Sequence, residues 1–545
     1  MASTIDSADP GNTYNTANWD FLRLYDRTVL AYTPTAGSAG LALKGDLATG
    51  LGSHNADMTQ WTYTITPNAT FSDGTPITTA DIKYAIERAG WGTGLGQGPT
   101  YFKTLIQNGN GYTGPYSGTS AATAGVSGIQ TPSATTIVFN LTQPFADFNY
   151  LMTPPETAPV EPSSDKGADE GAAYQQHMVT SGQYAISSYS VGKQMVLLPN
   201  AKFVAASDPN GLHKVHASKI VVNYGLGQIA VDQNLLSGQA QMDLSGSGVD
   251  VTAQGQILGD PVFKADADSV PDGFQTYLAI NTTLSPLTDL ACRQSIEEAI
   301  DKETVVSAAG GNIGGGAVAT NILPPDSTGY VQSDLYPTPG NQGNPVQAKS
   351  LFTQCKSDIG STFNPAFDIA TVEASQDPKA EQIAETVQRD LDEVGFNVSI
   401  VQYASNTMTD GNAPGAPATA DAGRIGLTVV SRDADFPTGY GYMENILTSA
   451  GIHTAGGSTN LSFWTSADFN SDLLSGLSAS SPTASAADYA AADAVAMKQA
   501  VIVPLLNQNV LMYRPATDTN VTVSLAYGMY DYSILGASAP ASGSK

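Results

Sequence analysis

Residues 61–88, WTYTITPNATFSDGTPITTADIKYAIER, place a strand, a turn and a helix in direct succession. Large apolar and polar side chains alternate in Trp61-Thr-Tyr-Thr-Ile65, as they do in a strand with one buried face. The Asp, Gly and Pro residues of Phe71–Pro76 are typical of turns. Thr78 and Asp81 then have the spacing of a capping box, which predicts that a helix begins near residue 78.

A second helix, followed by a strand, is predicted at residues 377–400. Asp377 is suited to the N-cap, Pro378 to the first helical position and Gly395 to the left-handed exit. Apolar residues then alternate from 396 to 400, as in a strand. The apolar stripe of this helix consists of Ile383, Val387, Leu391 and Val394. Mixed strands and helices of this kind predict α/β lobes.

Length and charge limit the class of protein. At roughly 150 residues per domain, the chain of 545 residues is expected to form three or four folding units. It has 23 Lys and Arg against 50 Asp and Glu, a formal net charge of −27. The negative electrostatic potential of such a chain repels phosphate backbones and anionic lipid, so we expect no nucleic-acid partner and no peripheral membrane role. The sequence also lacks a run of about 18 apolar residues that could span a bilayer.

The two cysteines and the start of the chain each leave two interpretations open. Cys292 and Cys355 are either buried thiols or one disulfide, and they form no CxxC motif of a zinc or redox site. Residues 1–6 have no basic region followed by an apolar one. This is expected of a cytoplasmic protein, or of an exported domain whose leader has been removed.

Motifs of catalysis are scarce. The sequence contains no GxSxG, HExxH or Walker A pattern, and we expect neither an enzyme nor a bound cofactor. His213 and His216 are close enough in sequence to share a metal ion. Because no third ligand is near them, we expect a surface loop there and no metal site.

Short motifs are spread along the chain in a characteristic order. In addition to residues 61–88, they are Leu22-Arg-Leu-Tyr-Asp26, Gly45-Asp-Leu-Ala48, Ser181-Gly-Gln-Tyr-Ala185, Leu278-Ala-Ile-Asn-Thr282, Cys292–Lys302, Leu323–Tyr330 and Asp435-Phe-Pro-Thr-Gly-Tyr-Gly441. In this order they resemble the oligopeptide-, dipeptide- and nickel-binding family (family 5) of solute-binding proteins of bacterial ABC importers, and the last motif resembles actinobacterial members. Gln183 stands where that family usually has Pro.

The resemblance implies a fold of two α/β lobes that close on a ligand, with an extra subdomain inserted in the first lobe. The first lobe is expected to comprise residues 1–45 and 178–272 and a C-terminal return at 490–545. The inserted subdomain is expected at 46–177, and the opposing lobe at 273–489.

The resemblance also implies a function. Such a protein captures oligopeptides by hinge closure and delivers them to the permease of an ABC importer. It is expected to act as a monomer outside the cytoplasm, at the cell surface, either lipid-anchored or periplasmic, which favours the interpretation that a leader was removed. In that oxidising space Cys292 and Cys355 are expected to pair.

The binding residues are carried over position by position. Asp435 matches the family's aspartate that binds the peptide ammonium group, and Arg432 stands where the family commonly has Trp. The candidate ligand-binding residues are Asp435, Arg432, Asp433, Phe436, Tyr440 and Tyr442, with Tyr25, Tyr101 and Trp464 as weaker candidates.

Three alternatives remain open at the level of sequence. The loss of Trp at position 432 is compatible with an oligosaccharide ligand, which the 24 tyrosines permit and the 4 tryptophans disfavour. A metal chelate is a second alternative, although the chain has only 5 histidines. A secreted glycoside hydrolase that uses Asp433 and Asp435 as paired carboxylates is the alternative from another class.

Overall fold

The computed structural model of the chain comprises two compact units, Met1–Asp268 with Met512–Lys545, and Ser269–Leu511. The second unit therefore continues to residue 511, whereas the lobe proposed from the family resemblance ends at 489; the finer division, with its inserted subdomain, stays a prediction. None of the described helices is both long and apolar enough to cross a membrane. The structure describes residues 1, 4–92, 95, 98–118, 124–165, 171–374, 377–404, 408, 414–480 and 482–538.

The second unit contains a six-stranded mixed sheet with the strand order β11-β15-β10-β14-β12-β13. Strand β12 is parallel to both of its neighbours, whereas β10 pairs with β14 in antiparallel fashion, with Gln275 opposite Arg432. The strands are β10 (Ala267–Ile280), β11 (Gly316–Val318), β12 (Ala366–Val372), β13 (Asn397–Tyr403), β14 (Ile425–Arg432) and β15 (Ile502–Tyr513).

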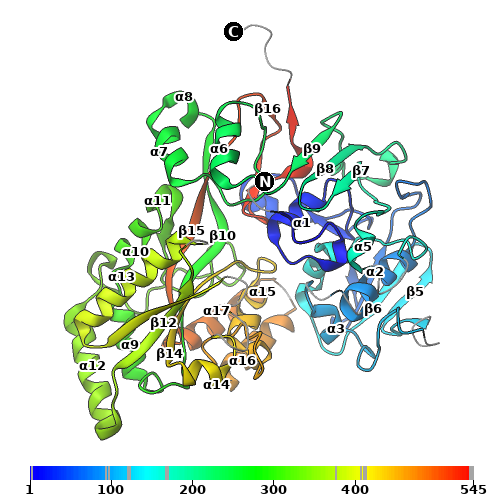
Figure 1. The fold of residues 1–545 in the computed structure, drawn as a ribbon. Coiled ribbons are helices and arrows are strands. Elements are labelled where there is room, and N and C mark those ends of the chain that lie inside the picture. The colour runs from blue at the N-terminus through cyan, green and yellow to red at the C-terminus, as the bar shows by residue number, and fades with distance from the viewer. Residues whose placement is uncertain are drawn as a thin grey trace. The chain divides into compact units, whose positions relative to one another are not determined.

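Helices lie along both sides of this sheet (Figure 1). One group consists of α9 (Leu290–Ala299), α10 (Lys302–Ala308), α12 (Pro345–Ile359) and α13 (Pro378–Val394), and the other includes α15 (Gly439–Leu447), α16 (Ala467–Leu477) and α17 (Pro482–Lys498). The helix predicted from residue 378 is confirmed as α13, since Asp377 accepts a hydrogen bond from the Ala380 N–H and Gly395 has a φ of 122°. Its apolar stripe packs in the core of the unit with β12 and β13.

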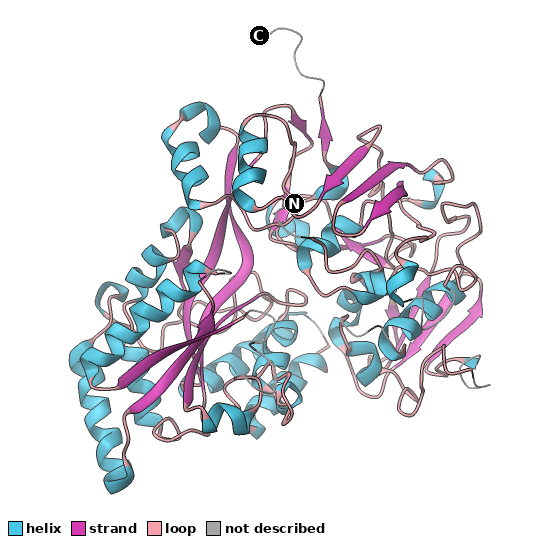
Figure 2. Cartoon of the chain, in the orientation of Figure 1, coloured by secondary structure: helices cyan, strands magenta, loops and turns pink. Residues whose placement is uncertain are grey.

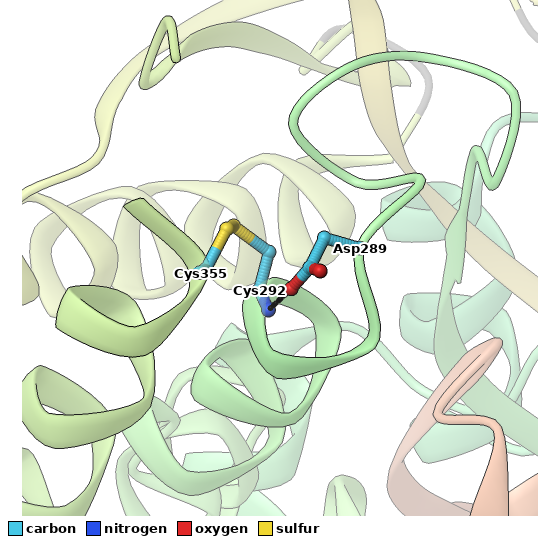
Figure 3. A group of neighbouring side chains, drawn as sticks. All are labelled: Asp289, Cys292 and Cys355. Atoms are coloured by element: carbon cyan, nitrogen blue, oxygen red, sulfur yellow. Dashed lines mark hydrogen bonds between the residues drawn. A yellow bond between two sulfur atoms is a disulfide. The ribbon is translucent and has the colours of Figure 1, made fainter. Parts of the chain in front are cut away.

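A disulfide joins helices α9 and α12, as the exported location predicts. Cys292 and Cys355 are fully buried, and their Cα atoms are 5.2 Å apart. Asp289 caps α9 by accepting hydrogen bonds from the N–H groups of Ala291 and Cys292 (Figure 3). Among the described residues these three side chains, Asp289 and the two cysteines, are the only close group of metal-ligand type. Because the sulfur atoms are bonded to each other, the group is structural.

The first unit is built from several small sheets, in contrast to the single large sheet of the second (Figure 2). A four-stranded sheet has the order β3-β4-β6-β5 and a three-stranded sheet the order β7-β8-β9. Their strands are β3 (Ser53–His54), β4 (Gln60–Thr64), β5 (Ile129–Ser133), β6 (Thr136–Asn140), β7 (Tyr184–Ser190), β8 (Gln194–Pro199) and β9 (Ile220–Asn223). Helices include α1 (Thr16–Leu22), α2 (Thr79–Trp91), α3 (Tyr101–Leu105), α6 (Gln228–Leu236) and α7 (Val251–Gly259).

The strand and helix predicted within residues 61–88 are confirmed as β4 and α2. The capping box forms in both directions: the Asp81 carboxylate accepts a hydrogen bond from the Thr78 N–H at 2.7 Å, and the Thr78 side chain accepts one from the Asp81 N–H. Trp61 and Tyr63 of β4 are buried against Phe148. The alternation in the sequence therefore separates the buried from the solvent-facing side of this strand.

The first unit also buries charged side chains that the sequence did not mark as internal. Arg88, at the end of the quoted stretch, is fully buried and pairs with Asp9 and Asp165. His213 is only 7% exposed, with its ring nitrogens 2.9 Å from Asp46 Oδ1 and 2.9 Å from Gln183 Oε1. The prediction of a surface loop is therefore wrong for His213, because the residue is held inside the unit by polar partners.

We expect the double substitution Cys292→Ser/Cys355→Ser to lower the free energy of unfolding of the second unit. For a sequence separation of 63 residues, the chain-entropy relation gives a loss of about 4 kcal/mol. Urea unfolding measures the loss, and reduction of the wild-type protein provides a control that should reproduce it. Equal stability of the oxidised wild type and the double variant would contradict this role of the disulfide.

Candidate functional site

The candidate residues of the second unit lie where strand β14 ends and helix α15 begins. Arg432 is the last residue of β14, and Thr438 caps α15 by accepting a hydrogen bond from the Gly441 N–H at 3.2 Å. Between them the Asp435 N–H donates to the carbonyl oxygen of Gly441, also at 3.2 Å. The connecting loop is thus folded back against the first turn of the helix.

Glycine at position 441 makes this close packing possible. A β-carbon there would lie 2.5 Å from the Phe436 carbonyl oxygen and 2.8 Å from its ring. Phe436 is only 2% exposed. The β-carbon would thus meet the carbonyl oxygen and the ring of Phe436 together, and the carbonyl is backbone that cannot rotate away. Any larger residue at 441 would therefore push the loop away from α15.

The Asp435 carboxylate is held from two directions. Arg432 Nη2 donates to Oδ1 and Asn445 Nδ2 donates to Oδ2, each at 3.1 Å. The side chain of Asp435 is 6% exposed and that of Arg432 is 18% exposed. The result is a desolvated carboxylate whose orientation is set by a guanidinium on one side and an amide on the other.

The charges of this group also act on a second acid, Glu444. Glu444 precedes Asn445 on α15 and is half-buried. Burial raises the pKa of Glu444 to about 7, the negative charge of Asp435 raises it further and the positive charge of Arg432 opposes the rise. Within the described part of the chain, no hydrogen bond reaches the Glu444 carboxylate.

The charge of Asp433, the other acid of the loop, acts on a half-buried strand residue, Asp272. Burial raises the pKa of Asp272 on β10 to about 7, and the negative charge of Asp433 adds to that rise. Asp433 therefore belongs to the same negatively charged region at the end of β14.

The aromatic candidates of this segment are packed inside the second unit. Phe436, Tyr440 and Tyr442 are 2%, 7% and 0% exposed. The Tyr442 hydroxyl donates to Gln275 Oε1 at 3.4 Å, and burial raises the pKa of Tyr442 well above its usual value. Trp464 is half-buried, with its ring edge-on to Phe469. Three of these four side chains therefore offer almost no free ring surface.

The two remaining candidates, Tyr25 and Tyr101, belong to the first unit. Tyr25 is fully buried and donates its hydroxyl hydrogen to the Ala8 carbonyl oxygen at 3.1 Å. Tyr101 is the first residue of α3 and is 8% exposed. Their proposed contact with a ligand stays a prediction.

Sequence reasoning did not single out Asn445 and Glu444. The sequence could have pointed to Glu444, because it lies four residues after the candidate Tyr440 and so shares one face of α15 with it. The contact from Asn445 to Asp435 spans ten residues and depends on the fold of the loop.

Comparison with known proteins identifies the family. Residues 42–454 match the model of bacterial extracellular solute-binding proteins, family 5 Middle. The chain belongs to this family. The family expected from the ordered motifs is therefore confirmed, whereas the resemblance to actinobacterial members stays a prediction. The chain has the two-lobed fold of periplasmic binding proteins.

Two relatives and one solved structure match over most of their length. The probable D,D-dipeptide-binding periplasmic protein DdpA of Escherichia coli K12 is 23% identical over 513 residues, which cover 93% of this chain and 87% of that protein. The periplasmic oligopeptide-binding protein OppA of Salmonella typhimurium is 22% identical over 464 residues, covering 83% and 77%. The structure of clavulanic acid biosynthesis oligopeptide binding protein 2 superposes with a TM-score of 0.91 at 30% identity, covering 99% of this chain and 94% of the other.

Family membership settles the broad class. Family 5 proteins bind solutes and are not enzymes, so the glycoside hydrolase alternative is excluded. The family is extracellular and the curated relatives are periplasmic, which places this protein outside the cytoplasm.

We expect Gly441→Ala to destabilise the protein by about 1–3 kcal/mol, because the new methyl group overlaps Phe436. The matched control is Gly255→Ala in helix α7, where a β-carbon meets nothing within 4 Å. That change should stabilise by about 0.5–1 kcal/mol. Thermal unfolding of both variants distinguishes the two positions; a stabilising effect of Gly441→Ala would show that the loop is not tightly packed on α15.

Proposed function

We propose that this protein captures oligopeptides and delivers them to the membrane permease of an ABC importer. Its relatives include proteins whose names specify dipeptides and oligopeptides as ligands. The observation that carries the proposal is the desolvated Asp435 carboxylate, oriented by Arg432 and Asn445. Such a group binds an ammonium ion more strongly than a solvated carboxylate does, because water competes less for it.

The ammonium end of the peptide is proposed to bind Asp435. The peptide backbone is expected to pair with extended protein segments, and bridging waters accommodate varied side chains. Arg432 in place of Trp removes a flat wall from the site and supplies a guanidinium that orients Asp435. Recognition by this segment is therefore proposed to be polar, with Phe436 and Tyr442 as its support.

The proposed transport cycle depends on a difference in ligand affinity between the open and the closed form of the protein. A solute that contacts both lobes stabilises the closed form, which a permease distinguishes from the open one. No covalent bond is made or broken in this cycle. We propose that the protein acts as a monomer and is either lipid-anchored or periplasmic.

The substrate class is tested directly by the molecules that co-purify with the protein. We expect denaturation and mass spectrometry to release short peptides. Recovery of an oligosaccharide or a metal chelate in their place would retain the family and contradict the peptide proposal.

Substitution of Asp435 tests the ammonium site. Loss of a charge-assisted hydrogen bond of about 1.5–3 kcal/mol predicts that Asp435→Asn weakens trialanine binding about 10- to 150-fold. Calorimetry of trialanine and of its N-acetylated form measures this, since acetylation removes the ligand charge. The acetylated peptide should bind the wild type as weakly as trialanine binds the variant.

Asp358→Asn is the matched control, because Asp358 is exposed on helix α12 and far along the chain from the loop. We expect it to bind trialanine with wild-type affinity. Undiminished binding by Asp435→Asn would contradict the assignment of Asp435. A wild-type protein that binds neither trialanine nor any recovered peptide would contradict the proposed function itself.

A further inference from the structure

Strand β9 forms one end of the three-stranded sheet of the first unit, and one of its edges is open. Among the described strands, β9 (Ile220–Asn223) pairs only with β8. The Tyr224 N–H donates to the Lys193 carbonyl oxygen at 2.9 Å. Bonded and non-bonded pairs alternate in an antiparallel ladder. The backbone N–H and C=O groups of Asn223 and Val221 therefore point away from β8.

One residue of extended chain already pairs with this edge. The Met1 ammonium group donates to the Asn223 carbonyl oxygen at 3.0 Å, and the Leu226 N–H donates to the Met1 carbonyl oxygen at 3.4 Å. The N-terminus accordingly lies next to β9 (Figure 1). At Val221, by contrast, no hydrogen bond from the described residues reaches the outward backbone groups. The edge is thus closed at Asn223 and open at Val221.

A cavity of about 570 Å³ follows the open edge. All four residues of β9 line it, although successive side chains of a strand point to opposite faces of the sheet. A cavity that all four residues line therefore runs along the edge of the strand. Its volume is within the range of small-molecule sites, about 300–1,000 Å³. Every residue that lines it belongs to the first unit.

Much of the remaining lining is apolar, and includes Leu24, Val231, Met242, Leu244 and Leu535. Val221 and Leu226, which also line the cavity, are each 43% exposed. Proteins usually protect the free edge of a sheet with charged residues or cover it with another segment. An open edge beside an apolar cavity instead suits an extended apolar peptide, which binds as an added strand.

Charge distinguishes the two ends of the edge. Lys219 directly precedes β9, lines the cavity and is exposed, and it forms no ion pair within the described part of the chain. Asp518 lines the cavity too, but both of its carboxylate oxygens are buried, and burial raises the pKa of Asp518 to about 7. The side-chain charge that a ligand meets is therefore the ammonium group of Lys219, which attracts a carboxylate.

We propose that the open edge of β9 is a second peptide site, which binds a short apolar peptide antiparallel to β9 with its carboxylate end at Lys219. The site belongs to the first unit, whereas the Asp435 loop belongs to the second, and it does not rest on the proposed function. The residue opposite Val221 exchanges two backbone hydrogen bonds with it. In a tripeptide this is the middle residue, because the carboxylate of the next residue extends toward Lys219.

Acetyl-trileucine tests the proposal on the unaltered protein, since it has a free carboxylate and lacks the ammonium group that Asp435 is proposed to bind. We expect calorimetry to show one molecule bound per chain. Methylation of the middle backbone nitrogen removes the donor to the Val221 carbonyl oxygen and should weaken binding about 2- to 12-fold, the value of one backbone hydrogen bond. Methylation of the first leucine nitrogen is the control, because that N–H points away from β9, and should leave the affinity unchanged.

A matched pair of variants tests the strand itself. Val221→Pro removes the outward N–H, a change that an edge strand accepts, and should weaken acetyl-trileucine binding by a similar factor. Val191→Pro is the control. Val191 occupies the second position of the turn in which the Lys193 N–H donates to the Ser190 carbonyl oxygen, where proline is favoured. It should bind as wild type. In the unaltered protein, hydrogen exchange of residues 219–224 should slow when acetyl-trileucine is added.

The outcomes separate this site from the proposed function. Equal affinity for the two methylated peptides, or no binding of acetyl-trileucine, would overturn the β9 site. A concentration-dependent dimer that acetyl-trileucine does not dissociate would also overturn it and assign the edge to a second copy of the chain. None of these results affects the binding of trialanine at Asp435. If neither trialanine nor a co-purified peptide binds while acetyl-trileucine does, the proposed function fails and the β9 site stands.

Discussion

The contact between Phe436 and Gly441 is the constraint on which the geometry of the candidate site depends. Without a side chain at 441, the loop after β14 lies directly on the first turn of α15. This places the Asp435 carboxylate within reach of Asn445, one full turn further along the helix. The strand contributes Arg432 from the other side. A packing contact between apolar and backbone atoms thus determines where three polar groups meet, because polar side chains alone would not hold a loop against water.

Buried charges have a comparable role in the first unit, in a protein whose surface is strongly acidic. Arg88 pairs with Asp9 and Asp165, which connects the helix of the opening stretch to two distant segments. Arg27 pairs with Asp46, to which His213 also binds. Burial of an unpaired charge lowers the stability of the folded protein far more than burial of a charge that has an ionic partner. These networks therefore favour one arrangement of the surrounding loops, where regular secondary structure is sparse.

Local signals allowed much of the fold to be predicted, and contacts between distant residues account for most of what was missed. Helix α13 has a cap, a proline, a periodic stripe and a glycine exit between Asp377 and Gly395, so its limits follow from adjacent residues. His213 looked like a loop residue because its partners Asp46 and Gln183 are far away in sequence. Gln183 stands where the family usually has Pro, and its amide oxygen contacts the His213 ring, which a proline could not do. Asp435 was found by resemblance, whereas Asn445 and Glu444 became evident only when the loop was seen folded against α15.

The replacement of Trp by Arg at position 432 changes the chemistry of the segment more than its shape. An aromatic ring would leave the Asp435 carboxylate without a positive partner, and only the Asn445 amide would then orient it. Arg432 supplies that partner and holds the carboxylate from the other side. In the proposed function the ammonium ion of a ligand therefore shares Asp435 with a guanidinium and an amide, and its affinity depends on how those two groups hold the carboxylate.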